Sequence, residues 1–246
     1  NRTYNELGTE KSGEPYEDQT DNYNQNIYQL HYSNQLTADW IANVSLHYTR
    51  GLGYFEEYHA GKNLDEFGIT PDPSGPSVSD LITRRWLDNH FYGMVFSTRY
   101  GTAKHWNVTF GGGINRYLGD HYGNVIWARY AGNSETDSQY YFNDGNKTDY
   151  NLYGKLQYGL TAGLSSYLDL QVRGIQYGFD GLDMQSTGAV AVRSDDRQFF
   201  FNPKAGLVYR KNDHRLFTSF SVAGKEPSRD EYVKSSAVDR PKPETM

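Results

Sequence analysis

The sequence predicts an all-β fold, an antiparallel transmembrane β-barrel segment of about eight strands, and three observations predict it. Apolar and polar side chains alternate along eight stretches, as they do in strands with one apolar and one polar face. The apolar faces of these stretches carry no charged side chain. The connections alternate between short and long, which is typical of the two rims of a membrane barrel with short periplasmic turns and long extracellular loops.

Composition excludes several other classes of protein. Hydrophobic residues are 37% of the 246 residues and the mean hydropathy is −0.80, so no apolar run is long enough for a transmembrane helix. A net charge of −6 provides no basic footprint for a nucleic acid. The absence of cysteine removes disulfides, thiolate metal sites and cysteine nucleophiles.

The first hairpin shows the alternation most clearly. From Tyr28 to Tyr48, every second residue lies on an apolar face rich in Tyr, Leu and Trp, and its neighbours are polar. We expect strands at 23–36 and 40–54, because only the residues 37–39 separate them and such a short connection makes a tight turn.

Three further hairpins follow the same plan. Their predicted strands are 90–100 with 106–117, 149–160 with 164–177, and 199–210 with 215–223. Long polar segments separate the hairpins: one is centred on the Pro- and Gly-rich residues 68–77, and the others are 118–148 and 178–198.

Charge sorting and aromatic residues bear on the choice between a membrane barrel and a soluble sandwich. The charged residues that fall within strands keep to the polar register: Arg99, Lys155, Asp169, Arg173 and Lys204. A lipid-facing Arg or Lys at the bilayer midplane costs about 2–4 kcal/mol, so a barrel requires this sorting. A soluble sandwich also sorts charge by face, whereas paired aromatic girdles indicate a membrane. The girdle candidates are Trp40, Trp106 and Tyr167 near short turns, and Tyr54, Tyr117 and Tyr177 near long loops.

Five stretches of the chain resemble the barrel of TonB-dependent outer-membrane receptors, and most closely the siderophore-receptor type of Bacteroidetes. They are DNYNQNIYQLHYSNQL, LHYTRGLGYFEEY, GGGINRYLGDHYGNVIWARY, SVAGKEPSRDEY and PKPET. The resemblance implies a barrel of about 22 strands whose lumen is closed by a plug domain. Residues 1–246 show no plug, and both ends of the chain point towards the long-loop side. We therefore expect residues 1–246 to be a partial barrel domain.

The resemblance also implies a function. It predicts a Gram-negative outer-membrane receptor and active transporter that takes up a scarce solute, namely a ferric siderophore. Its expected partners are the TonB complex, reached through the plug region, an extracellular iron chelate and outer-membrane lipid, with no nucleic acid and no cofactor. No catalytic arrangement stands out, so we do not expect an enzyme. A passive porin-like barrel and a soluble β-sandwich that binds carbohydrate remain alternatives.

Two groups of residues at the predicted outer mouth are candidates for ligand binding in extracellular loops. They are Glu56, Glu57, Tyr58 and His59, and Asp120, His121, Tyr122, Trp127 and Arg129. Carboxylates and imidazoles can contact a ferric chelate, and aromatic and Arg side chains suit polar planar ligands. A solvated loop, or a loop base with girdle aromatics, would account for the same residues.

Three other motifs have structural interpretations. His31 and His47 share the polar face, but no third ligand accompanies them at a metal-binding spacing, so we expect them to line the lumen and expect no metal site. Residues 225–230, KEPSRD, are expected to be structural, with their charges paired near the lumen. The glycine run 111–113 lies within a strand, where it indicates a bend or a close backbone approach.

Overall fold

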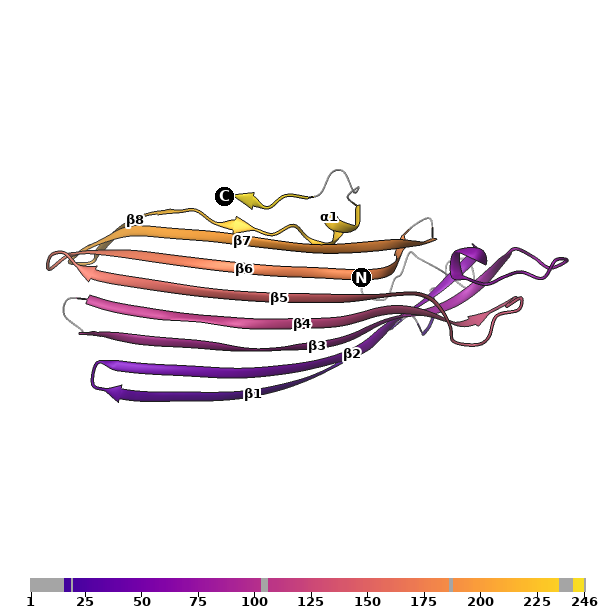
Figure 1. Ribbon diagram of the computed structural model, residues 1–246, viewed down its shortest axis with the longest axis horizontal. Helices are drawn as coiled ribbons and strands as arrows, with labels where there is room; N and C mark the ends of the chain where they lie inside the picture. Colours follow the sequence, from indigo (N-terminus) through magenta and orange to yellow (C-terminus); the bar gives the residue numbers. More distant parts are fainter. Residues whose placement is uncertain (1–15, 19, 103–105, 186–187, 235–240, 246) are drawn as a thin grey trace.

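The computed structural model describes residues 16–18, 20–102, 106–185, 188–234 and 241–245. Within these residues, eight antiparallel strands form one sheet in chain order (Figure 1). The strands are β1 (Asp21–Thr37), β2 (Trp40–Asn63), β3 (Val78–Thr102), β4 (Trp106–Ala128), β5 (Ser138–Gly159), β6 (Leu164–Gln185), β7 (Gly188–Lys211) and β8 (His214–Ser221). The predicted all-β antiparallel fold is confirmed.

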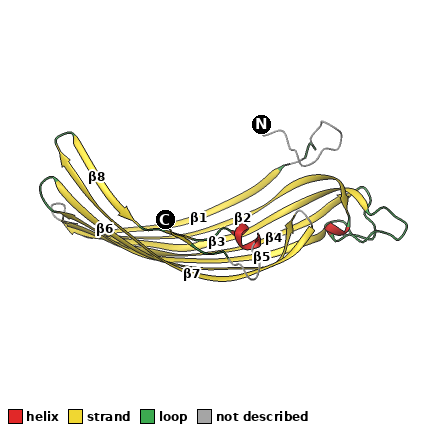
Figure 2. Ribbon diagram, turned by 90° about the horizontal axis from the view of Figure 1, so that it is seen from above, coloured by secondary structure: helices red, strands yellow, loops and turns green. Residues whose placement is uncertain are grey.

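Four small elements accompany the sheet. The 3-10 helix η1 (Asp65–Phe67) lies between β2 and β3, and α1 (Arg229–Lys234) follows β8. The short strands β9 (Gly224–Lys225) and β10 (Glu244–Thr245) pair with each other. The large sheet is curved like a section of a barrel wall, and β1 and β8 are its edges (Figure 2). Among the described residues, no helix is long and apolar enough to cross a membrane.

The outward face of the sheet is apolar and exposed over a defined band. Leu46, Met94, Ile114 and Tyr150 lie opposite one another across β2 to β5, and their exposed fractions are 46%, 36%, 50% and 50%. No second sheet of the described chain covers this face, so the soluble β-sandwich alternative is wrong. An apolar surface of this extent marks an interface, and lipid is the partner that a barrel wall requires.

Two rows of aromatic residues mark the lower and upper edges of the apolar band. Trp40, Tyr100 and Trp106 form its lower edge, with ring centroids 6.1 and 5.3 Å apart. Tyr48 and Tyr92 form its upper edge, eight residues along β2 from Trp40. At about 3.3 Å per residue and a strand tilt of about 40°, the two rows lie roughly 20 Å apart, close to the ~25 Å apolar band of such barrels.

Four of the six girdle predictions are wrong. Tyr54 faces outward but lies six residues along β2 above Tyr48, and the other three residues lie in the inward register. Tyr167 lies on the inward face between Lys155 and Lys204, with each Nζ 6.0 Å from its ring. Tyr117 donates a hydrogen bond to Asn89 Oδ1 at 2.6 Å, and the Tyr177 ring contacts Tyr232 in α1. Closeness to a strand end suggested these girdle positions, but odd or even position along the strand decides which face a side chain joins.

The strands are longer at the long-loop end than the sequence predicts. The predicted starts and ends at the short turns are correct to within two residues, whereas β2, β3, β4 and β5 each extend nine to twelve residues farther at their other ends. The loop predicted at 178–198 is wrong, because β6 and β7 pair as far as Gln185 and Gly188. Above the lipid-facing band, charged and polar side chains also occupy the outward face, so the hydrophobic alternation weakens while the hydrogen-bonded pairing of the strands continues.

An apolar cluster holds the first long connection against the inward face. Leu64, Ile69 and Leu81 are almost fully buried and pack with Phe67 and neighbouring residues of β4 and β5. Gly68 ends η1 with a φ of 68°, a conformation that favours glycine. The glycine run in β4 also behaves as predicted, because a Cβ at Gly112 would lie 2.4 Å from the Asn151 carbonyl oxygen.

Val44→Arg tests the assignment of the lipid-facing band. The substitution places a charge at the middle of the band, four residues along β2 from both Trp40 and Tyr48, and should lower the free energy of unfolding by about 2–4 kcal/mol. Asn43→Arg, in the inward register of the same strand, is the matched control and should have a much smaller effect. Urea unfolding of the intact protein in lipid vesicles measures both, and equal losses would contradict the assignment.

Candidate functional site

The inward face at the long-loop end is covered by the segment that follows β8. Arg229 of α1 donates from Nη1 to His121 Nδ1 at 2.8 Å, and from Nη2 to Asn143 Oδ1 at 2.8 Å and Asp183 Oδ2 at 3.1 Å. Its guanidinium lies 5.7 Å from the centre of the Phe179 ring. One side chain therefore joins α1 to β4, β5 and β6.

A second ion-pair network lies on the same face. Glu226 contacts Lys147 of β5 at 2.6 Å and Arg173 of β6 at 3.4 Å. Arg173 also pairs with Asp149 of β5. Glu226 and Arg229 thus pair with the wall, and Lys225 pairs with Glu244 of β10. These contacts agree with the structural role predicted for this motif.

The nine predicted ligand-binding residues lie mostly in strands. Their placement in extracellular loops is wrong: four are in β2, four are in β4, and Arg129 follows β4 directly. Because successive side chains of a strand point to opposite faces, these residues are divided between the inward and outward faces of the sheet. Glu57, His59 and His121 are in the inward register, and Glu56, Tyr58, Asp120, Tyr122 and Trp127 are in the outward register. Neither group forms one site, because consecutive strand residues point to opposite sides.

Glu57 and His59 form a buried pair on the inward face. His59 Nε2 is 3.8 Å from a Glu57 carboxylate oxygen and 3.0 Å from Thr83 Oγ1. Burial lowers the pKa of His59 to about 4, and Lys62 and Arg85 lower it in the same direction. Burial also raises the pKa of Glu57. Both shifts favour the neutral forms, so this pair stabilises the wall more than it attracts a charged ligand.

Two further candidates, Glu56 and Arg129, form hydrogen bonds with neighbouring side chains of the protein. Glu56 accepts hydrogen bonds from Arg84 Nε at 2.8 Å and from the Tyr16 hydroxyl at 2.9 Å. Arg129 donates to Asp80 Oδ2 at 2.8 Å. The first predicted group is therefore built into the wall above the membrane.

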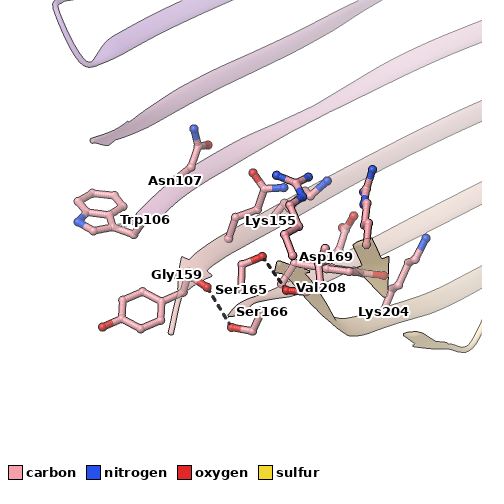
Figure 3. Close-up of a pocket in the computed structure, with 14 residues that line it drawn as sticks. Trp106, Asn107, Lys155, Gly159, Ser165, Ser166, Asp169, Lys204 and Val208 are labelled. Atoms are coloured by element: carbon pink, nitrogen blue, oxygen red, sulfur yellow. Dashed lines mark hydrogen bonds between the residues drawn. The ribbon is translucent and has the colours of Figure 1, made fainter. Parts of the chain in front are cut away.

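A pocket lies at the short-turn end of the inward face, and several positively charged side chains line it (Figure 3). Its volume is about 600 Å³, and its inward-facing charged residues are Lys155, Asp169, Lys204, Arg210 and Arg215. Lys155, Asp169 and Lys204 lie opposite one another on β5, β6 and β7, and Arg210 lies directly opposite Arg215. None of the four cations forms an ion pair within the described residues, so this end of the wall carries unneutralised positive charge.

Sequence reasoning did not single out this pocket. The alternation of side chains predicts that Lys155 and Lys204 share the polar face, but their proximity depends on the register of three strands. The one sequence signal is that basic residues lie towards the short-turn ends of β5, β7 and β8, namely Lys155, Lys204, Arg210 and Arg215.

The contacts of His31 and His47 give no support for metal binding. His31 Nδ1 contacts Ser45 Oγ at 2.8 Å, and His47 Nε2 contacts Asn115 Oδ1 at 2.8 Å. Within the described part of the chain, no three His, Asp or Glu side chains form a group that could hold a metal ion.

Comparisons with known proteins agree with this geometry. The family described as TonB dependent receptor-like, beta-barrel matches residues 1–246. A search of curated proteins finds no match.

Three solved structures share the fold. The ferric-catecholate import receptor Fiu from E. coli K12, in its closed form, matches with a TM-score of 0.59 and 11% identity, over 88% of this chain and 35% of that one. The siderophore receptor PiuA from Acinetobacter baumannii gives 0.55 and 10%, over 92% and 37%. The ferric yersiniabactin uptake receptor FyuA from Yersinia pestis gives 0.50 and 13%, over 81% and 28%.

The curved sheet, its lipid-facing band and its polar inward face define a segment of an outer-membrane receptor barrel. The chain belongs to the TonB-dependent receptor β-barrel family, and its location is the outer membrane of a Gram-negative bacterium. It spans about a third of the length of the receptors that it matches.

Arg229→Gln tests the attachment of α1 to the wall. The substitution removes the charge from three hydrogen bonds and should lower the free energy of unfolding by about 1.5–3 kcal/mol. The control is Arg193→Gln, whose side chain is 83% exposed and lies 4.0 Å from Asp180; its effect should be close to zero because exposed ion pairs contribute little. Urea unfolding in vesicles, with proteolysis of residues 224–234 as a second measurement, separates the two. Equal effects would contradict the role of Arg229.

Stability should also depend on pH through the two partly buried histidines, His59 and His121. Burial lowers the pKa of His121 to about 4, and Arg229 lowers it in the same direction, as burial does for His59. The unfolded chain, with a His pKa of about 6.5, therefore binds more protons between these values, and the free energy of unfolding should fall as the pH decreases from about 6.5 to about 4.

The double substitution His59→Gln and His121→Gln should flatten this dependence. The raised pKa of Glu57 acts in the opposite direction, but Glu57 is present in both proteins and its contribution cancels to first order in the comparison. Unfolding curves measured at several pH values provide the slopes. An unchanged slope in the double variant would contradict the neutral state of the two imidazoles.

Proposed function

We propose that this chain is part of a receptor that actively imports a ferric siderophore of anionic character, driven by the TonB complex. The observation that carries the proposal is the unneutralised positive charge of the pocket around Lys155 and Lys204 on the inward face. Siderophore complexes that use catecholate or carboxylate groups are anions, and closely placed ammonium and guanidinium groups attract them.

The contrast between the two ends of the inward face supports an anionic cargo. At the long-loop end, Arg173, Lys147 and Arg229 are paired with carboxylates. At the short-turn end, Asp169 is the one acid among the residues that line the described pocket. An anion that crosses the barrel would therefore meet increasing positive charge towards the periplasmic side.

The solved structures that share the fold are themselves described as receptors for cargo of this class. Fiu, PiuA and FyuA are described as receptors for ferric catecholates, siderophores and ferric yersiniabactin, respectively. At 10–13% identity these matches show the fold alone, so the cargo of this chain is a proposal that rests on the charge of its own residues.

We also propose that residues 1–246 form one section of a larger closed barrel. β1 and β8 are edge strands, and their exposed backbone groups need partners in a membrane. Pairing with strands outside residues 1–246 would supply them. The plug and the TonB contact would likewise belong to other parts of the receptor.

Uptake of a radiolabelled polyanionic iron(III) catecholate chelate tests the proposal in iron-starved cells that carry the complete receptor. Uptake should require both the receptor and TonB, and Lys155→Gln with Lys204→Gln should reduce its rate about tenfold, the loss expected for about 1.4 kcal/mol of electrostatic stabilisation. Lys211→Gln, in the outward register at the end of the same strand as Lys204, is the matched control and should leave uptake unchanged.

Two results would contradict the proposal. Uptake that continues at the same rate without TonB would favour a passive porin-like barrel. An equal loss of uptake in the Lys211 variant would show that the effect comes from the stability of the strand end and not from the charge of the pocket.

A further inference from the structure

Four aromatic side chains form a row on the outward face, well above the lipid-facing band. Tyr54, Trp86, Tyr122 and Phe142 lie opposite one another on β2, β3, β4 and β5. Successive ring centroids are 4.7, 6.0 and 6.5 Å apart, and the Trp86 and Tyr122 planes are within 11° of parallel. We call these four side chains the aromatic ladder. Its rings are partly exposed, with Phe142 at 42%.

The height of the aromatic ladder excludes acyl chains as its partner. It lies six residues along β2 from Tyr48, the upper edge of the apolar band. With about 3.3 Å per residue and a tilt of about 40°, this distance is roughly 15 Å along the membrane normal. The headgroup layer of a phospholipid leaflet extends only about 5–8 Å above the hydrocarbon. A lipid that reaches the ladder must therefore carry a longer polar headgroup.

Between the apolar band and the aromatic ladder, positively charged residues lie in the lower rows and negatively charged residues lie in the row above them. Arg116 lies in the row of Tyr48 and Tyr92, at the height where lipid phosphates begin, and Arg50 lies one step above that row. The next row contains a carboxylate on each of four adjacent strands: Asp88, Asp120, Asp144 and Asp180. Arg50 pairs with Asp88. Arg193 lies 4.0 Å from Asp180 at the other end of the row. Asp120 and Asp144 lie directly opposite each other between these pairs, and like charges opposite one another destabilise a sheet.

The chemistry of this surface fits a saccharide. Flat aromatic rings present an apolar face to the C–H groups of a sugar ring, and carboxylates accept hydrogen bonds from its hydroxyl groups. The Arg84 guanidinium, 4.4 Å from the centre of the Tyr54 ring, extends the platform at the edge of the ladder. Because the ladder is continuous with the lipid-facing band on the same strands, the saccharide that it meets is attached to a lipid.

We propose that the aromatic ladder, with the carboxylate row below it, binds the oligosaccharide headgroup of a glycolipid in the outer leaflet. The lipid-facing band holds the acyl chains of this glycolipid, the arginines near its upper edge meet the phosphates, and the ladder stacks on the sugars. The bound lipid holds the long-loop ends of β2 to β5, which extend above the lipid-facing band, at a fixed height relative to the membrane.

The experiment uses the complete receptor in phosphatidylethanolamine and phosphatidylglycerol vesicles that contain one of two glycolipids. One is rough lipopolysaccharide with core sugars, and the other is lipid A without them. Glycolipid retained per receptor after detergent extraction is measured by native mass spectrometry. The wild-type receptor should retain the core-bearing form about tenfold more than lipid A, which corresponds to about 1.4 kcal/mol of sugar contacts.

Three variants identify the residues responsible. Trp86→Leu with Tyr122→Leu should reduce retention of the core-bearing form to the level of lipid A, whereas Trp86→Phe with Tyr122→Phe, which keeps both rings, should retain most of it. Tyr150→Leu removes an outward ring within the lipid-facing band and should not change the preference for core sugars.

Three outcomes would overturn the proposal. One is equal retention of the two glycolipids by the wild type, which would show that phosphates and acyl chains suffice; this comparison holds even if the leucine variant does not fold. Another is unchanged retention in a folded leucine variant. The third is loss of association with a second receptor copy in that variant while glycolipid retention persists, which would assign the ladder to a protein interface.

Discussion

Every feature of this structure depends on the hydrogen-bonded ladder between neighbouring strands. Inside a bilayer no water is present to satisfy a backbone N–H or C=O, so each group must be paired with the adjacent strand. In this chain the groups are paired between neighbouring strands, which requires an extended backbone, and an extended backbone sends successive side chains to opposite faces. Leu46 therefore faces lipid, while His47 contacts Asn115 on the inward face. Membrane anchoring and a polar interior come from the same geometric cause.

The sequence predicts this geometry where the two faces meet different solvents. Between Trp40 and Tyr48 lipid lies on one side and water on the other, and the alternation is clear. Beyond Tyr54 both sides are polar, so the pattern fades although β2 continues to Asn63. For this reason the sequence alone predicts a loop for the candidate residues from Glu56 to His59. Their division between the two faces follows from strand geometry once the strand is known to continue.

Contacts between segments that are distant in the chain cannot be predicted from one sequence. Residues 225–230 look charged and functional, but the partners of Arg229 lie on three strands, from His121 to Asp183. Likewise the charge around Lys204 is apparent only after β5, β6 and β7 are aligned. The motif signals that a contact exists, and the register determines which residues make it.

The continuous register of the sheet has a consequence for how such a protein can diverge. From Trp106 to Gly123, β4 pairs with β5 without interruption. Because side chains alternate with a period of two, deleting one residue there would exchange the two faces of the strand beyond that point. Changes in chain length are therefore confined to the rim, in the connections at 64–77 and 129–137. Evolution can reshape the extracellular mouth by insertion, whereas the wall below it can change only by substitution.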